Sequence, residues 1–233
     1  MKEDGTSLEH FSGTVRLFPL PNVVLFPQVV QPLHIFEPRY RQMTVDALAD
    51  DRLIAPVLLR PGWDADYEGQ PAVQPVLCVG RIVAEQRMPD GRFNLLLRGV
   101  SRARIVEELP SDKLYRSARV ELTAEGPTPT PDRVRWLRER IGTAVQPWFP
   151  DDGPALRQLE KLVQNPELPL GVLCDLLGFA APLLIEAKQQ LLETTDIEER
   201  AQLLLQFLQV NQPPTAGQQP AKKQKFPPDF SCN

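Results

Sequence analysis

The sequence predicts an α+β protein in which a mostly antiparallel β-barrel with one helix comes first and a C-terminal α-helical bundle follows. Two observations carry this prediction. Between residues 14 and 123, short runs of partly alternating apolar and polar residues are separated by turn-forming residues, which is typical of strands in a small barrel. After residue 130 the apolar residues recur every three to four positions, which is the period of an amphipathic helix.

The barrel is expected to fold around a proline-rich stretch near the N-terminus. Leu17–Met43 contains five prolines, and proline fixes φ and donates no backbone hydrogen bond, so one long strand or helix is excluded. We expect a strand to about Phe18, a rigid crossing through Pro19–Pro27 and a strand near Pro32–Phe36. A helix that opens on a proline is expected next, over Pro38–Asp50.

Further apolar runs continue the predicted barrel. Leu53–Leu59 contains a proline, which favours an edge strand or a bulge. Val76–Met88 and Arg92–Arg98 are joined by a Pro-Asp-Gly turn and predict a hairpin. Two more strands are expected over Ser101–Leu109 and Tyr115–Thr123, which gives six or seven strands in all.

The domain organisation follows from composition. We expect a flexible arm over residues 1–13, the barrel over 14–123, a linker over 124–130, a helical subdomain over 131–210 and a disordered tail over 211–233. Five helices are predicted in the subdomain. They begin at the Thr130–Pro131 cap, at Pro154, at Leu170 (ending at Gly178), at Pro182 and at a capping box opened by Thr195.

Charge and cysteine content narrow the class of protein. The net charge of −4 argues against a general nucleic-acid binder, which usually has a basic domain. Three widely spaced cysteines exclude a disulfide scaffold and a cysteine-rich zinc site. No run is long and apolar enough for a membrane span or a signal peptide. We therefore expect a cytoplasmic protein that holds no metal and no cofactor.

Two motifs carry a family resemblance. They are FPLPNVVLFPQVVQPLHIFEPRYRQM, which starts at Phe18, and VGRIVAEQRMPDGRFNLLLRGVSRARIVEEL, which starts at Val79, with a weaker match in LLETTDIEERAQLLLQFL. The chain resembles the Lon protease N-terminal domain, a substrate-binding module with a PUA-like β-barrel. The resemblance implies binding of unfolded or exposed segments of client proteins, either directly or as an adaptor, with a protease or chaperone as a further partner.

The motifs of catalysis are absent from the sequence. There is no GxxxxGK[ST] phosphate loop and no room for an ATPase or protease domain, so we expect no enzyme. His34 beside Glu37 and Cys78 is an alternative, as a thiol nucleophile with its base. A hydrogen-bonded structural histidine is the simpler interpretation, because nothing in the spacing indicates that these residues meet.

Candidate binding residues lie in two places. Phe36, Arg39 and Tyr40 flank the start of the first helix, where free N–H groups favour anionic ligands. Trp63 and Tyr67 lie in the loop after the third strand, where aromatic residues either contact a partner or pack back. The structural alternatives are that Arg39 pairs with a carboxylate and that Tyr40 belongs to the core.

A second hypothesis is an RNA- or nucleotide-binding module. Its expected site is an arginine-rich barrel face that consists of Arg98, Arg102 and Arg104, for which a salt-bridged surface is the alternative. The last helix is apolar most of the way round, so a homodimer through the helical subdomain is also left open.

Overall fold

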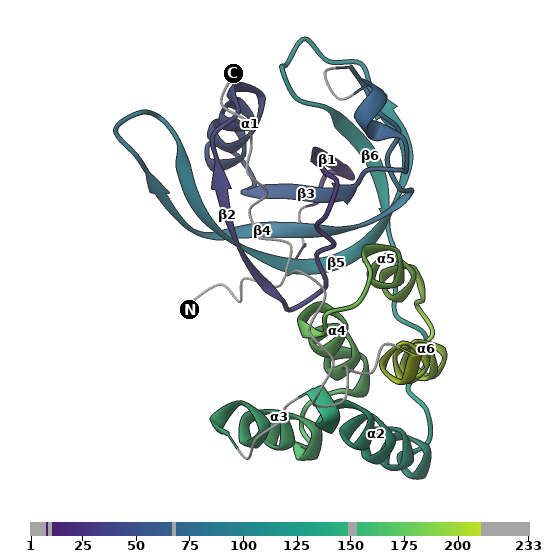
Figure 1. The fold of residues 1–233 in the computed structure, drawn as a ribbon. Coiled ribbons are helices and arrows are strands. Elements are labelled where there is room, and N and C mark those ends of the chain that lie inside the picture. Colours follow the sequence, from purple (N-terminus) through teal and green to yellow (C-terminus); the bar gives the residue numbers. More distant parts are fainter. Residues whose placement is uncertain (1–7, 9–10, 67–68, 149–152, 211–233) are drawn as a thin grey trace.

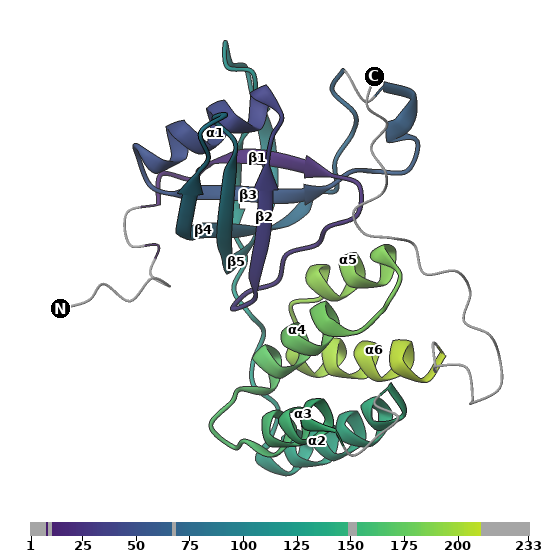
Figure 2. The ribbon, with the colours of Figure 1, turned by 60° about the vertical axis from the view of Figure 1, so that its left-hand side comes forward.

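The computed structural model describes residues 8, 11–66, 69–148 and 153–210. A β-sheet half lies at one end of the molecule and a helical half at the other (Figure 1, Figure 2). The predicted α+β class, strands before helices, is confirmed. The strands are β1 (Thr14–Leu20), β2 (Val30–Ile35), β3 (Leu53–Leu58), β4 (Val76–Arg87), β5 (Phe93–Leu109) and β6 (Ser117–Leu122).

The sheet has the strand order β2-β5-β4-β3-β1-β6, and β5 also pairs with β6. The pairings therefore run in a ring through β5, β4, β3, β1 and β6, which is the connectivity of a barrel. All pairs are antiparallel except β1 with β3. The strand β5 organises the sheet, because its first half pairs with β2 and its second half with β6.

The structure has one long strand where the sequence predicted two, over Arg92–Arg98 and Ser101–Leu109. Residues 93–109 form the single strand β5, and the expected break at Gly99 is a crossing point instead. The chain before β2 passes over Gly99, whose N–H donates to Val29 O and whose carbonyl accepts from Gln28 N, both at 2.9 Å. A Cβ on Gly99 would lie 2.0 Å from Phe26 O. Glycine is therefore required here for close approach of two backbones.

The helices follow the predicted ranges with three corrections. The helix expected to begin at Pro182 begins at Ile185. Gly178 lies inside its helix rather than after it. The absence of a side chain at Gly178 leaves room for Leu191, whose Cδ1 would be 3.1 Å from an added Cβ. Asp196, not Thr195, caps the last helix by accepting from Glu199 N at 2.9 Å. The helical elements are α1 (Pro38–Leu48), η1 (Trp63–Asp66), α2 (Pro131–Val145), η2 (Gln146–Trp148), α3 (Pro154–Gln164), α4 (Leu170–Ala180), α5 (Ile185–Glu193) and α6 (Ile197–Val210).

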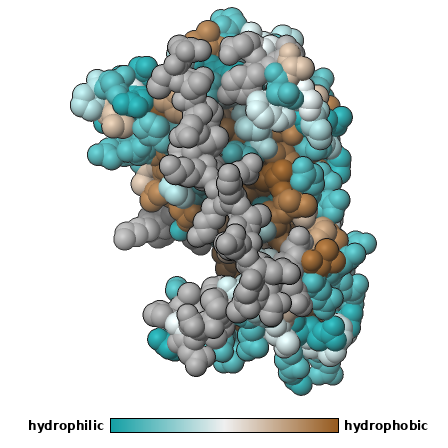
Figure 3. Space-filling model, viewed as in Figure 1, coloured by the Kyte–Doolittle hydropathy of each residue, from teal (hydrophilic) through white to brown (hydrophobic). Residues whose placement is uncertain are grey.

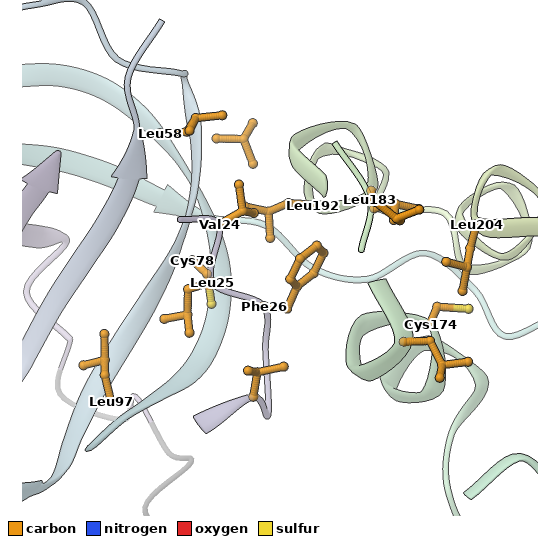
Figure 4. Packing of buried hydrophobic residues seen from close by; sticks show 14 of the residues in the cluster. Val24, Leu25, Phe26, Leu58, Cys78, Leu97, Cys174, Leu183, Leu192 and Leu204 are labelled. Carbon is orange, nitrogen blue, oxygen red and sulfur yellow. The ribbon is translucent and has the colours of Figure 1, made fainter. Parts of the chain in front are cut away.

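One hydrophobic cluster runs without a break from the sheet half into the helical half. Phe26, fully buried, lies between Leu25 and Cys78 on the side of the sheet and Cys174 of α4 on the side of the helices (Figure 4). A smaller second cluster fills the sheet half around Leu17. In the face shown in Figure 3, hydrophobic surface gathers at the level where the halves meet. The two halves are thus packed as one body.

Candidate functional site

A groove with a volume of about 840 Å³ opens at the end of the sheet half that lies away from the helices. Three segments form it: the start of α1, the chain that follows β3, and the turn between β5 and β6. Pockets of this size bind small ligands or short peptide segments. The residues that line it are Pro19, Glu37–Tyr40, Leu59, Gly69–Pro71, Glu108–Ser111 and Lys113–Arg116.

The floor and the rim of the groove differ in character. Leu59, Tyr40 and Tyr115 form a buried floor, each less than a tenth exposed. At the rim, the Leu114 side chain is 64% exposed, and Pro110 is also exposed. When a partner covers an exposed leucine, binding is favoured by roughly 25 cal/mol per Å² of apolar surface removed from water.

The charged groups of the groove neutralise one another. Arg116 holds Glu108 through both Nε, at 2.7 Å, and Nη2, while its Nη1 donates to Pro71 O at 2.8 Å. On the opposite wall, Arg39 pairs with Glu37 at 2.9 Å. A ligand that enters this groove therefore meets little net charge.

The carboxylate of Asp46, in α1, contacts two residues that line the groove. Asp46 accepts a hydrogen bond from the Tyr115 hydroxyl at 2.8 Å and pairs with Lys113 at 3.2 Å. Partial burial alone would raise the pKa of Asp46, but these two partners outweigh it and lower that pKa. Burial, followed by the hydrogen bond to Asp46, raises the pKa of Tyr115. The turn that carries Tyr115 is thus tied to α1.

The predicted residues at the start of α1 divide between the groove and its surroundings. Arg39 and Tyr40 line the groove, but Arg39 pairs with Glu37 and Tyr40 packs edge-on against Phe18 at 4.5 Å. The structural alternatives therefore also hold: Arg39 pairs with a carboxylate, and Tyr40 belongs to the core. Phe36 is 46% exposed and stacks on His34, outside the groove.

The predicted loop residues do not line the groove. Trp63 begins η1 and is half-buried. Tyr67 lies outside the described residues. Sequence reasoning instead missed the end of β5 and the turn that follows it, which supply Leu109, Pro110 and Leu114. The available signal was a leucine in the otherwise polar run that precedes Tyr115.

The predicted arginine face does not exist as one surface. Arg102 is 2% exposed, and it holds Asp175 of α4 by two nitrogens, at 3.0 and 2.5 Å. Arg98 and Arg104 remain at or near the surface. The physical reason is that the helical half covers the sheet at Arg102, whose Nε donates to Leu192 O at 2.9 Å. The prediction of an anionic-ligand face is therefore wrong for Arg102.

The thiol alternative is also not supported. Cys78 is fully buried, and burial raises the pKa of its thiol to about 12. His34 is exposed, and its Nδ1 lies 2.8 Å from Asn94 Oδ1. Within the described part of the chain, no group of three or more His, Cys, Asp or Glu residues is arranged to hold a metal ion. In the same part, no helix has the length and apolar character needed to cross a bilayer.

Comparison with known proteins gives a consistent result. A family model described as the ATP-dependent protease La (LON) substrate-binding domain matches residues 14–210. Lon protease 2 of Myxococcus xanthus is 29% identical over 203 residues, which are 86% of this chain and 24% of that protein. The Lon protease of Dictyoglomus thermophilum is 28% identical over 198 residues. The chain spans about a quarter of the length of the curated relatives that it matches.

Two solved structures share the fold. The N-terminal domain of the Mycobacterium avium complex Lon protease superposes with a TM-score of 0.63 at 18% identity, over 85% of this chain and 99% of that one. The Lon N-terminal domain protein from Xanthomonas campestris gives a TM-score of 0.60 at 22% identity, over 83% of this chain and 98% of that one. Both comparisons therefore extend beyond the sheet half, which alone is about half of the chain.

Proposed function

The chain belongs to the family of the ATP-dependent protease La (LON) substrate-binding domains, and from that premise we propose that it recognises unfolded or exposed segments of client proteins without hydrolysing them. The family match supports the substrate-binding role, since it is to this domain and not to a protease domain. Delivery of the client to a protease or chaperone is part of the same proposal.

The groove at the end of the sheet half is the observation that carries this proposal. Its buried floor is partly aromatic, and its rim presents Leu114 and Pro110. An extended segment of an unfolded protein offers apolar side chains and unpaired backbone groups, and both find partners in such a groove. Folded proteins bury these features, so the groove selects for unfolded or exposed segments.

The paired charges of the groove set the expected salt dependence. Because Glu37 and Glu108 are neutralised by arginines of the same wall, a client segment gains little from long-range attraction. Apolar contact is not weakened by moderate salt, whereas phosphate contacts weaken steeply with it. Binding of a client is therefore expected to change little between low and physiological salt.

The test is binding of a chemically unfolded, fluorescently labelled protein to the purified chain across a salt series, beside a labelled RNA. We expect salt-insensitive binding of the unfolded protein and none of the RNA. Leu114→Ser should weaken the binding several-fold. Val106→Ser is the matched control, because Val106 is 43% exposed on β5 but does not line the groove. Equal effects of the two variants would contradict the proposal, as would binding of RNA alone.

A further inference from the structure

The outer face of the sheet formed by β2, β5 and β4 carries ordered rows of side chains that the groove does not use. β2 pairs with β5 in regular register, and β5 pairs with β4 in regular register on each side of an irregularity at Val83. Residues that pair across the three strands therefore lie side by side. The inward residues of β5, Leu95 and Leu97, are buried. Their alternating neighbours therefore point outward.

The middle row is apolar and exposed. Pro32, Leu96 and Ala84 are direct partners across β2, β5 and β4. Leu96 is 42% exposed, and Val83, at the irregularity beside Ala84, is 40% exposed. Val30, at the near end of β2, is also 40% exposed. Adjacent exposed apolar residues on a sheet face mark an interaction surface more often than single ones do.

An unneutralised arginine borders this row. Arg98 pairs with Val30 on one side and with Arg81 on the other. Arg81 turns away, since its Nη1 donates to Asp51 O at 3.1 Å. Over the whole described part of the chain, Arg98 has no ion pair and no side-chain hydrogen bond. One guanidinium group is thus available beside the apolar row.

On the other side of the apolar row, opposite Arg98, lies a row of polar side chains that hydrogen-bond to one another. His34 Nδ1 lies 2.8 Å from Asn94 Oδ1, and Asn94 Nδ2 lies 3.5 Å from Gln86 Oε1. These side chains bond to one another. They therefore bound the apolar row without offering a second charged contact.

The edge of β2 does not provide an alternative way to bind. A partner strand would have to extend the sheet beyond β2, whose central residue Pro32 has no N–H to donate. Proline at such an edge blocks the addition of a strand. A partner must therefore lie across the face rather than continue the sheet.

We propose that this face, which consists of Pro32, Leu96, Ala84, Val83 and Val30 with Arg98, binds a protein segment that presents a carboxylate next to apolar side chains. Charge complementarity selects this occupant. A second copy of the chain, packed symmetrically through the same face, would offer Arg98 no carboxylate, because none of the residues of this face is acidic. A nucleic acid would need several free basic groups, and this face has one.

The experiment selects random peptides displayed on phage against the full chain and measures the dissociation constants of synthetic versions of the selected peptides. We expect the selected peptides to share an acidic residue beside an apolar one. Arg98→Glu should weaken their binding about tenfold or more, because a charge-assisted hydrogen bond is replaced by repulsion. Leu96→Ser should weaken it several-fold.

Matched controls lie on the same strand. Arg104 is an exposed arginine of β5 with no ion pair among the described residues, and Val106 is as exposed as Leu96. Arg104→Glu, Val106→Ser and the groove variant Leu114→Ser should leave the affinity unchanged. The proposal is overturned if the peptides lack acidic residues or if Arg98→Glu and Arg104→Glu act alike. Concentration-dependent dimerisation that Leu96→Ser abolishes, or RNA binding that Arg98→Glu abolishes, would also overturn it.

Discussion

Two arginine–carboxylate pairs, each formed through two nitrogens of the arginine, occur in two different regions of this protein. Arg102 holds Asp175 between the two halves, where both side chains are at most 2% exposed, and Arg116 holds Glu108 at the rim of the groove, where they are 16% and 37% exposed. The comparison shows that burial rather than contact geometry decides what a pair does: the first joins the halves and the second shapes a binding surface.

The interface pair is part of a larger buried set. Arg200 of α6 also contacts Asp175, with Nε 3.4 Å from Oδ1, and Glu125 contacts both arginines. Burial raises the pKa of the Asp175 carboxyl, and the hydrogen bonds and positive charge of Arg102 and Arg200 oppose this effect. The four groups come from β5, the segment before α2, α4 and α6. They therefore fix the position of the helices on the sheet.

The largest expected effect comes from removal of the buried carboxylate. Asp175→Asn leaves two buried guanidinium groups with only Glu125 to balance them, and loss of one partner of a buried pair costs about 3–5 kcal/mol. Urea denaturation should show this loss in the free energy of unfolding. The exposed Asp50, 2.7 Å from Arg16 and 67% exposed, provides the control, since Asp50→Asn should cost less than about 1 kcal/mol. Similar losses in the two variants would mean that the interface is hydrated.

A smaller loss is expected where the chain crosses β5 beside the interface. In Gly99→Ala the new Cβ would lie 2.0 Å from Phe26 O, so the crossing segment must shift, at a cost of about 1–3 kcal/mol. Gly142→Ala in α2 is the control, because its Cβ would meet only the Val163 side chain, at 3.0 Å. Thermal unfolding followed by circular dichroism measures both. An unchanged melting temperature for Gly99→Ala would show that the crossing is loosely held.

The sequence predicted most of the fold because local signals agree with it. Pro38 and the spacing after it predicted α1, and the Pro-Asp-Gly turn predicted the hairpin between β4 and β5. The burial of Arg102 was not predictable from strand alternation, which places it on the same face as Arg98. In the structure the pairing of β5 with β4 slips by one residue at Val100, so Arg102 lies beside Cys78 and Arg98 beside Arg81, on opposite faces of the sheet. A lone aspartate in the apolar helix Leu170–Ala180 was the one signal of a buried partner.

The groove was predicted only in part for a similar reason. Arg39 and Tyr40 were found because they flank a helix start, which is a local feature. The opposite wall comes from residues 108–116, far away in the sequence, and only the pairing of β5 with β6 brings them there. Long-range pairing of this kind leaves little trace in composition or period.

At the groove wall, the carboxylate of Asp46 is expected to contribute about 1 kcal/mol to the free energy of unfolding, and this contribution depends on pH. Because its folded-state pKa is lowered, its stabilising effect is present above the unfolded value of about 3.9 and is lost as the pH falls through the folded value. The wild-type chain should therefore be more stable than Asp46→Asn at pH 7, and the difference should shrink towards pH 3. Urea denaturation over a pH series measures this. A difference that is constant with pH would exclude the titration of Asp46 as its cause.

The smallest effect on stability, and the one that separates the two regions most clearly, is expected from Glu108→Gln. This exposed pair should contribute less than about 1 kcal/mol to the free energy of unfolding, in contrast to the Asp175 pair. The variant removes the carboxylate partner of Arg116, however, and leaves an uncompensated positive charge at the groove rim. The carboxylate of Asp46 does not compensate it, because Asp46 already pairs with Lys113. Binding of the unfolded client should then become salt-dependent, which fluorescence anisotropy at two salt concentrations detects. If the salt dependence stays flat while stability falls as far as in Asp175→Asn, Glu108 acts on the fold rather than on the binding surface.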